Sequence, residues 1–378
     1  MKPQHLIMGT FFLQALSFGA WLPRIPELQA RLELGPSGLA LALLGLPLGL
    51  LAAMPFAGPL VARIGGRSAV RWSFPAFLAC ICLPPASSHF AMLFVALLLT
   101  GAAMAIVELG MNIVADDIEK HDKVAIMSRC HGFWSLGMMA GSLCGSGLAA
   151  IGLAPHWSAL LVAVLVAPLS LLVPAALPAS TPAAAVPAEK ASGLFIPGLL
   201  LLSICIVGLA SNLAEGASAD WSAVYLTDVF AATSGAAGLG YSAYALTMAI
   251  GRFAGDWARV KWGPVALVRT CYGVAAIGVA LVAFSPHYAA AIVGFALIGI
   301  GGSVGVPLAV SAAASVGGRP AASNVAMVTL VSLVAFVGGP PVIGFLAQHF
   351  GIRFALGITM FPAFAAGLLL ASSLRPRT

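Results

Sequence analysis

The sequence predicts an all-α polytopic membrane protein with twelve transmembrane helices in two six-helix halves, and three observations support this. Of the 378 residues, 61% are apolar and 8% are charged, whereas soluble domains are about 25% charged. Apolar runs of about 18 residues or more recur along the whole length, and each is long enough to cross a hydrocarbon core of about 30 Å. A stretch rich in proline, alanine and serine divides these runs into six and six.

The same composition argues against several other classes of protein. A signal peptide on a soluble domain fails because the apolar runs never stop, and a β-barrel fails because barrels alternate in segments of about ten residues. The chain contains no G-x-x-x-x-G-K-[ST] and no H-E-x-x-H, the motifs of phosphate loops and zinc proteases. Its six cysteines lie in or beside apolar runs without a C-x-x-C pair, which is typical of core residues. We therefore expect neither an ATP-driven pump nor a membrane enzyme, and no cofactor or metal.

Twelve spans can be placed on the apolar runs. Spans 1 and 7 are longer than a straight crossing needs. Tilt, or a local break near Gly19 and Pro23 or near Gly208 and Gly216, would absorb the excess. Two runs of small residues, in spans 5 and 11, are predicted helix contacts. The twelve spans are 6–30, 38–61, 69–86, 90–115, 131–152, 157–178, 197–229, 236–257, 264–284, 288–311, 324–347 and 353–373.

The basic residues fix the expected orientation. With the N-terminus inside, 14 of the 18 Lys and Arg residues fall in cytoplasmic segments, Arg24, Arg31 and Arg353 fall outside, and Arg252 lies within span 8. The positive-inside rule then places both termini in the cytoplasm of a bacterial inner membrane protein. This split also explains the net charge of +6 without any nucleic acid. The 14 residues are Lys2, Arg63, Arg67, Arg71, Lys120, Lys123, Arg129, Lys190, Arg259, Lys261, Arg269, Arg319, Arg375 and Arg377.

The two halves echo each other at the turn that follows their second span. The first half reads "PFAGPLVARIGGRSAVR" over 55–71, and the second reads "RFAGDWARVKWGPVALVR" over 252–269. Both contain Phe-Ala-Gly, a basic turn with glycine and a Val-Arg pair, at an offset of 197 to 198 residues. Parallel six-span repeats are typical of transporters that bind substrate between the halves. The repeat predicts a first half at 1–178, a cytoplasmic linker at 179–193 and a second half at 194–378.

Over its whole length the chain resembles the major facilitator superfamily. The signature loop of that family, between spans 2 and 3, reads Gly, three residues, Asp, a basic residue, any residue, Gly and further basic residues. In "GPLVARIGGR", the residues Gly58, Arg63, Gly65 and Arg67 match it, and Ala62 stands in the place of the aspartate. The resemblance implies a central cavity lined by spans 1, 4, 7 and 10, with the matching residues in a loop at the cytoplasmic gate.

Three stretches resemble the MosC-like branch, which is related to the fucose permeases. In fucose permeases an acidic residue of span 4, in a pattern like Glu-x-x-x-Asn, is associated with proton coupling, and Glu108 and Asn112 match that pattern. Those permeases also carry an acidic residue in span 1, where this chain has Trp21, Arg24 and Glu27, so the resemblance does not imply a sugar substrate. The three stretches are 21–44, 108–137 and 215–226.

Two glutamates are predicted to lie at membrane depth, where a carboxylate costs roughly 2.5–3.5 kcal/mol. Glu215 shares a helical face with Asn212, and Glu108 shares one with Asn112. Burial favours the neutral form of a carboxyl group, so such a residue can take a proton from the acidic side and release it to the cytoplasm. We predict proton coupling at Glu108 and Glu215. The alternative is that they are structural groups that form hydrogen bonds between helices.

Further polar residues are candidates for the substrate site and for the gate. Arg24 can clamp an anionic substrate or extend to the membrane interface. Arg252 and Asp256 lie four residues apart and are predicted to pair at the cytoplasmic gate. His131 can relay protons or lie at the interface. The predicted substrate contacts are Trp21, Arg24, Asn112, Asn212, Asp220 and Trp221.

These observations predict a secondary active transporter that moves a small polar solute across the inner membrane by alternating access, with coupling to protons. Import of a polyol or sugar-like solute fits the resemblance, and export of a metabolite or drug fits apolar cavity walls. A channel or sensor on the same fold is the alternative from another class. We expect a monomer in the lipid bilayer that binds protons and a small molecule and no nucleic acid.

Overall fold

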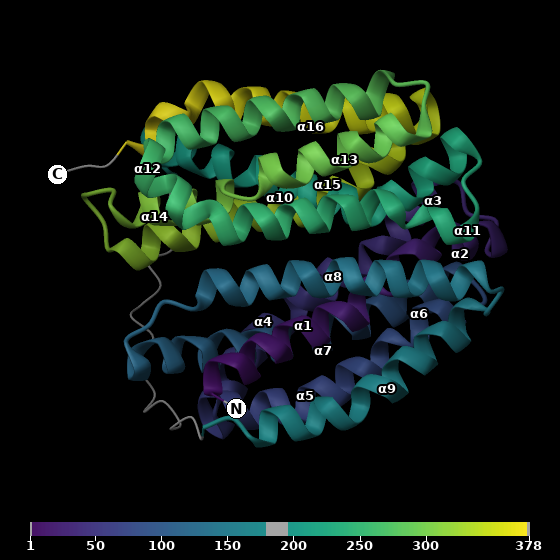
Figure 1. Ribbon diagram of the computed structural model, residues 1–378, viewed down its shortest axis with the longest axis horizontal. Coiled ribbons are helices and arrows are strands. Elements are labelled where there is room, and N and C mark those ends of the chain that lie inside the picture. The colour runs from purple at the N-terminus through teal and green to yellow at the C-terminus, as the bar shows by residue number, and fades with distance from the viewer. Residues whose placement is uncertain (1, 179–195, 376–378) are drawn as a thin grey trace.

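The structure, a computed structural model, describes residues 2–178 and 196–375, so the predicted linker at 179–193 lies outside the described residues. The helices form two bundles that lie side by side (Figure 1). The first bundle contains α1 (Pro3–Gly19), η1 (Leu22–Arg24), α2 (Ile25–Arg31), α3 (Pro36–Leu43), α4 (Gly45–Ile64), α5 (Gly66–Ile81), α6 (Leu83–Ala86), α7 (Phe90–Asp122), α8 (Met127–Ala150) and α9 (Pro155–Ala175). The second contains α10 (Leu199–Phe230), α11 (Ser234–Ala237), α12 (Leu239–Phe284), α13 (Tyr288–Gly302), α14 (Gly305–Ala314), α15 (Ala321–Phe350), α16 (Ile352–Leu370) and η2 (Ala371–Leu374).

Twelve membrane crossings can be assigned within the described ranges. Ten helical segments are long and apolar enough to cross a bilayer. One of them has 51 residues, or about 77 Å at 1.5 Å per residue, which is enough for two crossings. It is broken at Gly263, where φ is 74° and ψ is 160°. Helix α8, with 24 residues, supplies the twelfth crossing. The predicted twelve-helix fold is confirmed.

Spans 1 and 10 are each divided by a break. Span 1 breaks after Gly19 into α1, η1 and α2, as predicted, whereas α10 runs unbroken past Gly208 and Gly216. Span 10 divides into α13 and α14 around Ser303, which the sequence did not predict. Broken helices at membrane depth are tolerated where they line a cavity, and Ser303 does line the cavity described below.

The internal repeat is visible in the backbone. Gly65 ends α4 with φ 81° and ψ 150°, and Gly263 breaks α12 with nearly the same angles, 198 residues later. Gly152 and Gly351 form a second pair with positive φ, 199 residues apart, before the last span of each half. Since positive φ favours glycine, these pairs mark equivalent turns in the two halves.

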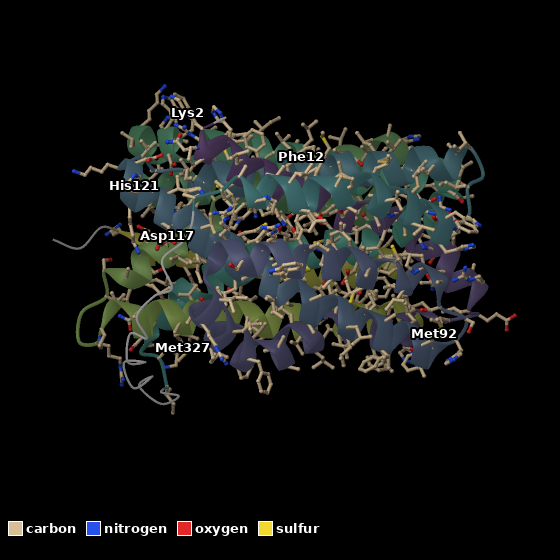
Figure 2. All side chains as sticks on the ribbon, turned by 90° about the horizontal axis from the view of Figure 1, so that it is seen from below. Lys2, Phe12, Met92, Asp117, His121 and Met327 are labelled. Atoms are coloured by element: carbon tan, nitrogen blue, oxygen red, sulfur yellow. The ribbon has the colours of Figure 1, made fainter. Side chains whose placement is uncertain are left out.

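The molecule has two chemically different ends. The basic end carries the two described chain ends, Lys2 and Arg375, together with most of the cations, and Figure 2 places Lys2, Asp117 and His121 at this end, far from Met92. The opposite end carries Arg24, Arg31 and Arg353. Of the 16 described Lys and Arg residues, 12 lie at the basic end, and they are Lys2, Arg63, Arg67, Arg71, Lys120, Lys123, Arg129, Arg259, Lys261, Arg269, Arg319 and Arg375.

Small residues allow close helix contacts in both predicted runs. A Cβ on Gly141 would lie 2.2 Å from the carbonyl oxygen of Leu16, so α8 can pack this closely on α1 only with glycine there. On α15, a Cβ on Gly344 would lie 2.2 Å from the Cβ of Ala40 on α3. The second contact joins the two halves at the opposite end.

Candidate functional site

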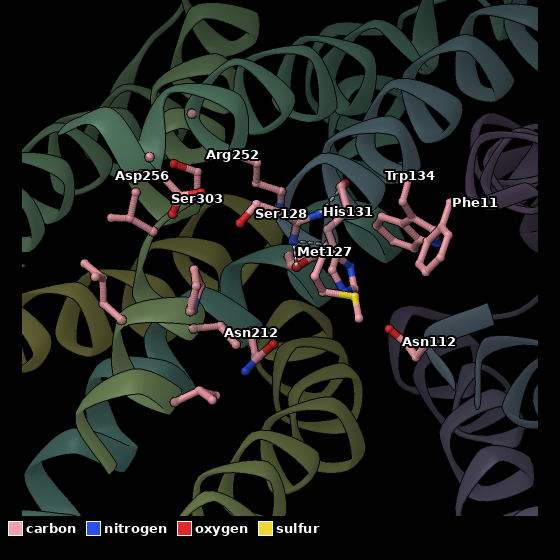
Figure 3. Close-up of a pocket in the computed structure, with 18 of the residues that line it drawn as sticks. Phe11, Asn112, Met127, Ser128, His131, Trp134, Asn212, Arg252, Asp256 and Ser303 are labelled. Atoms are coloured by element: carbon pink, nitrogen blue, oxygen red, sulfur yellow. Dashed lines mark hydrogen bonds and ion pairs between the residues drawn. The ribbon is translucent and has the colours of Figure 1, made fainter. Parts of the chain in front are cut away.

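A cavity of about 500 Å³ lies between the two halves. Helices α1, α7 and α8 form its wall in the first half, and α10, α12, α14 and α15 form its wall in the second (Figure 3). Apolar side chains such as Phe11, Met111 and Phe336 make up much of the wall. Its polar residues are Glu108, Asn112, Ser128, His131, Asn212, Glu215, Arg252, Asp256, Arg259 and Ser303.

The cavity opens toward the basic end and is closed toward the opposite end. Its lining residues Ser128, Asp256 and Arg259 are exposed, whereas the deeper Glu108 and Glu215 are half-buried. At the opposite end, Ser37 on α3 donates from its hydroxyl to the side-chain oxygen of Gln348 on α15, at 3.4 Å. The cavity is therefore accessible from the basic end in this structure.

Arg252 joins the two walls of the cavity near its centre. Its Nη2 lies 3.2 Å from Oε2 of Glu215 on α10, within its own half. Its Nη1 donates to the hydroxyl of Ser135 on α8 at 2.7 Å, across the interface between the halves, and its guanidinium lies 5.9 Å from the ring centre of Trp134. The predicted pairing of Arg252 with Asp256 is therefore wrong for this structure, because the neighbouring helix supplies a carboxylate deeper in the cavity.

Glu108 faces the same space from the first half. Within the described residues, its carboxylate has neither an ion pair nor a hydrogen bond, although its backbone carbonyl accepts a hydrogen bond from Asn112 at 2.9 Å. Glu108 and Glu215 are near enough to repel each other when both are ionised. The carboxylates of Glu108 and Glu215 thus face the same half-buried space, and among the described residues Arg252 pairs with Glu215 and not with Glu108.

Amide groups flank these charges on both sides. Asn112 lines the cavity from the first half, and Asn212 lines it from the second (Figure 3). Asn212 donates from Nδ2 to the hydroxyl of Ser332 at 2.7 Å and to the carbonyl of Gly208 at 3.2 Å. Asn212 is therefore held by its own half, and its amide oxygen accepts no hydrogen bond from the described residues.

Comparison with known proteins identifies the family. The profile of the Major Facilitator Superfamily matches residues 7–214. An uncharacterized MFS-type transporter of Yersinia pestis is 33% identical over 349 residues, which cover 92% of this chain and 89% of the relative. This chain belongs to the major facilitator superfamily.

The more detailed resemblance is also confirmed. The membrane protein MosC of Rhizobium meliloti is 29% identical over 370 residues, covering 96% of this chain and 86% of that protein. The crystal structure of the E. coli fucose:proton symporter superposes with a TM-score of 0.64 at 17% identity, over 99% of each chain. At that identity the superposition shows the fold alone. This member of the superfamily is a multi-pass membrane transporter.

The superfamily signature loop lies at the basic end, where α4 turns into α5. Gly65 forms the turn with positive φ, and Arg67 donates to the backbone carbonyl of Ala175 at the end of α9. Arg63 lies in the last turn of α4, and Gly58 has open space where a Cβ would be. The loop is thus tied to the sixth span of its own half, and its role in a gate remains a prediction.

The structure does not bring Trp21 and Arg24 into the cavity. Arg24 is 2% exposed, and it donates to the carboxylate of Glu27 at 3.0 Å and to the carbonyl of Gly145 at 3.5 Å. Trp21 is 4% exposed. After the break at Gly19, Arg24 donates to the carbonyl of Gly145 on α8 and to that of Leu153 in the turn before α9. The predicted substrate contacts at these two positions are not found in this state.

Asp220 and Trp221 also lie outside the cavity. At about 100° per residue, Asp220 is turned by about 140° from Glu215 on α10, and Trp221 by about 240°. Trp221 is completely buried, and its ring lies close to Gly344 at the contact between the halves. Asp220 is near Tyr241. Only Asn112 and Asn212, of the six predicted substrate contacts, line the cavity in this structure.

The sequence analysis named His131 as a possible proton relay, but it missed the polar stripe that His131 forms with two serines on α8. Ser128, His131 and Ser135 follow each other at steps of three and four, so they share one face of the helix. Ser128 and His131 line the cavity, and the hydroxyl of Ser135 accepts a hydrogen bond from Arg252. This spacing was the signal that could have identified α8 as a cavity helix.

Proposed function

We propose that this protein is a secondary active transporter that moves a small polar solute across a bacterial inner membrane by alternating access, coupled to protons. One observation carries the proposal. In the central cavity, the carboxylate of Glu108 in the first half, which has no ion pair with any residue in 2–178 or 196–375, faces the Arg252–Glu215 ion pair of the second half. A charge is costly at membrane depth, so an ionisable residue there without a partner is expected to have a function.

The charges in this space suggest how a proton would be bound. With Glu108 ionised, the three groups carry a net charge of −1, and one proton on Glu108 makes the site neutral. The neutral site would change conformation at lower cost, because an uncompensated charge is expensive to bury. One proton that crosses about 100 mV releases about 2.3 kcal/mol, and one pH unit adds about 1.4 kcal/mol.

The same cavity supplies contacts for the solute. Asn112 and Asn212 offer amide groups from opposite halves, and Ser303 offers a hydroxyl at the break between α13 and α14. Such groups suit a polyol, a sugar or a sugar-like solute, which agrees with the fold likeness to a fucose:proton symporter. Because these contacts come from both halves, a bound solute would help to close the cavity.

The orientation follows from the charges. If the basic end is cytoplasmic, as the positive-inside rule requires, the cavity of this structure is open to the cytoplasm and the contact between Ser37 and Gln348 closes the outer side. We further propose that the transporter works as a monomer, since each chain contains both halves of the cavity.

The apolar part of the wall favours a second candidate. Phe11, Met111 and Phe336 line the space beside the charges, which suits export of a less polar metabolite or drug on the same gradient. The two candidates differ in the direction of coupled flux. Import requires solute to accumulate inside vesicles that are alkaline inside, whereas export by exchange requires accumulation in vesicles that are acidic inside.

The experiment uses the purified protein in liposomes. A thermal-shift screen of polyols, sugars, nucleosides, amino acids and organic anions first identifies a solute that stabilises the folded state. Accumulation of that solute under a pH gradient and its counterflow without a gradient are then measured. Glu108→Gln should lose accumulation and keep counterflow, because exchange needs alternating access but no net proton release.

The control is Asp116→Asn, which removes a carboxylate from the exposed end of the same helix, where it pairs with Lys120. It should leave both activities unchanged. Normal accumulation by Glu108→Gln would show that coupling lies elsewhere, and loss of both activities would make Glu108 a binding residue for the solute.

A further inference from the structure

A second pocket lies at the basic end of the second half, away from the central cavity. It has a volume of about 560 Å³ and sits where α12 reverses direction at Gly263. We refer to it as the α12 turn pocket, and the residues that define it are Trp262, Gly263, Arg269, Thr270 and Arg375.

The internal repeat explains why this pocket is open. At the equivalent turn of the first half, the side chain of Arg67 spans the space to the end of α9 and donates to the carbonyl of Ala175. At the offset of 198 residues, Val265 takes the place of Arg67. The side chain of valine is too short to span that distance and has no hydrogen-bond donor. The space that the arginine side chain fills in the first half is therefore open in the second half, where it forms the pocket.

Cations surround the opening. Arg269 and Arg375 line it and are exposed, and Lys261 lies beside it over the rings of Trp257 and Trp262, at 4.9 and 5.7 Å. Within residues 2–178 and 196–375, no ion pair involves any of these three cations, and no acidic residue lines the pocket. Like charges that are left together without a counter-ion favour binding of an anion.

Exposed apolar surface adjoins the same cations. Trp257 and Trp262 are 59% and 52% exposed, and Val260 is 88% exposed. Tryptophan is enriched at the level of the lipid headgroups, and these residues lie where the membrane-spanning part of α12 ends. A free ion would leave this apolar surface in water, whereas the acyl chains of a lipid would cover it.

We propose that the α12 turn pocket binds the phosphodiester headgroup of an anionic phospholipid. Arg269 and Arg375 would bind the phosphate oxygens, for which the planar guanidinium is suited, and Lys261 would add a third positive charge. Basic pockets between transmembrane helices bind such headgroups in other membrane proteins. The site is separate from the transport cavity, so it does not depend on the proposed transport function.

Tryptophan fluorescence of the purified full-length protein in detergent tests the proposal. Phosphatidylglycerol and phosphatidylcholine with brominated acyl chains quench nearby tryptophans, and the two titrations give the preference for the anionic lipid. Arg269→Gln/Arg375→Gln should reduce this preference by about tenfold or more, since each cation near a lipid contributes about 1 kcal/mol. The lysine-substituted pair, Arg269→Lys/Arg375→Lys, should keep most of the preference. In Trp257→Phe/Trp262→Phe, most of the quenching specific to phosphatidylglycerol should disappear.

The matched control is Lys2→Gln/Lys123→Gln, which removes two exposed cations from the same end of the other half. Its preference should equal that of the unmodified protein. The proposal is overturned if the control loses as much preference as the arginine pair, because the effect would then be general surface charge. It is also overturned if inorganic phosphate, at the same concentration as the lipid, reverses the quenching, or if the arginine pair binds phosphatidylglycerol normally.

Discussion

Arg252 lies 3.2 Å from the carboxylate of Glu215 on a neighbouring helix of its own half, and it simultaneously donates to Ser135 in the other half. The side chains of the pair are only 18% and 14% exposed. This pair therefore holds charge in the centre of the molecule and connects the halves at the depth where a solute would bind.

Removal of one partner of this pair should lower the free energy of unfolding more than removal of both. Arg252→Gln leaves Glu215 as an unpaired, half-buried charge, so we expect it to lower the free energy of unfolding by on the order of 2 kcal/mol, less than for a fully buried pair. Arg252→Gln/Glu215→Gln leaves no such charge and should recover most of that loss. Thermal unfolding of the unmodified protein, the two single variants and the double variant in detergent gives the interaction energy of the pair as a double-mutant cycle. Equal and additive losses would show that the two residues do not stabilise each other.

Arg24 should contribute to stability rather than to solute binding. Its buried guanidinium donates to the carbonyl of Gly145 and to the carboxylate of Glu27. Arg24→Ala leaves these acceptors without their donor and should lower the free energy of unfolding by about 2–3 kcal/mol. Because Arg24 does not line the cavity, the affinity for a solute found by thermal shift should be unchanged in the variant that still folds. A loss of affinity with unaltered unfolding temperature would restore the sequence-based prediction of an anion clamp.

The charge distribution predicts the topology. Green fluorescent protein fused after position 190 or after position 378 should fluoresce, and alkaline phosphatase at the same places should be inactive, because both positions are expected in the cytoplasm. Fusions within 151–154, at the opposite end, should give the reverse pattern. Active phosphatase at position 190 would invert the proposed orientation and, with it, the side to which the cavity opens.

Much of the fold could be predicted from the sequence, because apolar runs and turn glycines are local signals. The same is true of Glu108, Asn112, Asn212 and Glu215, whose cavity face follows from helical periodicity. The partner of Arg252 could not be predicted in this way, because spacing along one helix favours Asp256, whereas the nearest carboxylate in space belongs to α10.

Two other errors have different causes. The position of Arg24 depends on the direction that the chain takes after the break at Gly19, and the sequence does not fix that direction. The placement of Trp221 was an error of periodicity, since the angle from Glu215 could have been calculated from the sequence.

Gly344 should control closure of the opposite end. A Cβ at this position would lie 2.2 Å from the Cβ of Ala40 and 2.7 Å from the carbonyl oxygen of Pro36, both on α3 of the other half. Gly344→Ala should therefore push α15 away from α3 and favour the state that is open at this end. Overpacking of this kind costs about 1–3 kcal/mol, which corresponds to a shift of about tenfold in the equilibrium between the two states.

Disulfide cross-linking measures this shift. Cysteines at positions 37 and 348 replace a hydrogen-bonded pair of side chains, so in a background with the six native cysteines replaced by serine they should cross-link rapidly when the end is closed. Gly344→Ala should slow the cross-linking by about tenfold. Gly338→Ala is the matched control, because a Cβ at Gly338 on the same helix meets no atom within 4 Å, and its cross-linking rate should not change. If both glycine variants cross-link at the unmodified rate, the contact between Gly344 and α3 does not limit closure, and the packing of α8 against α12 must hold the halves together instead.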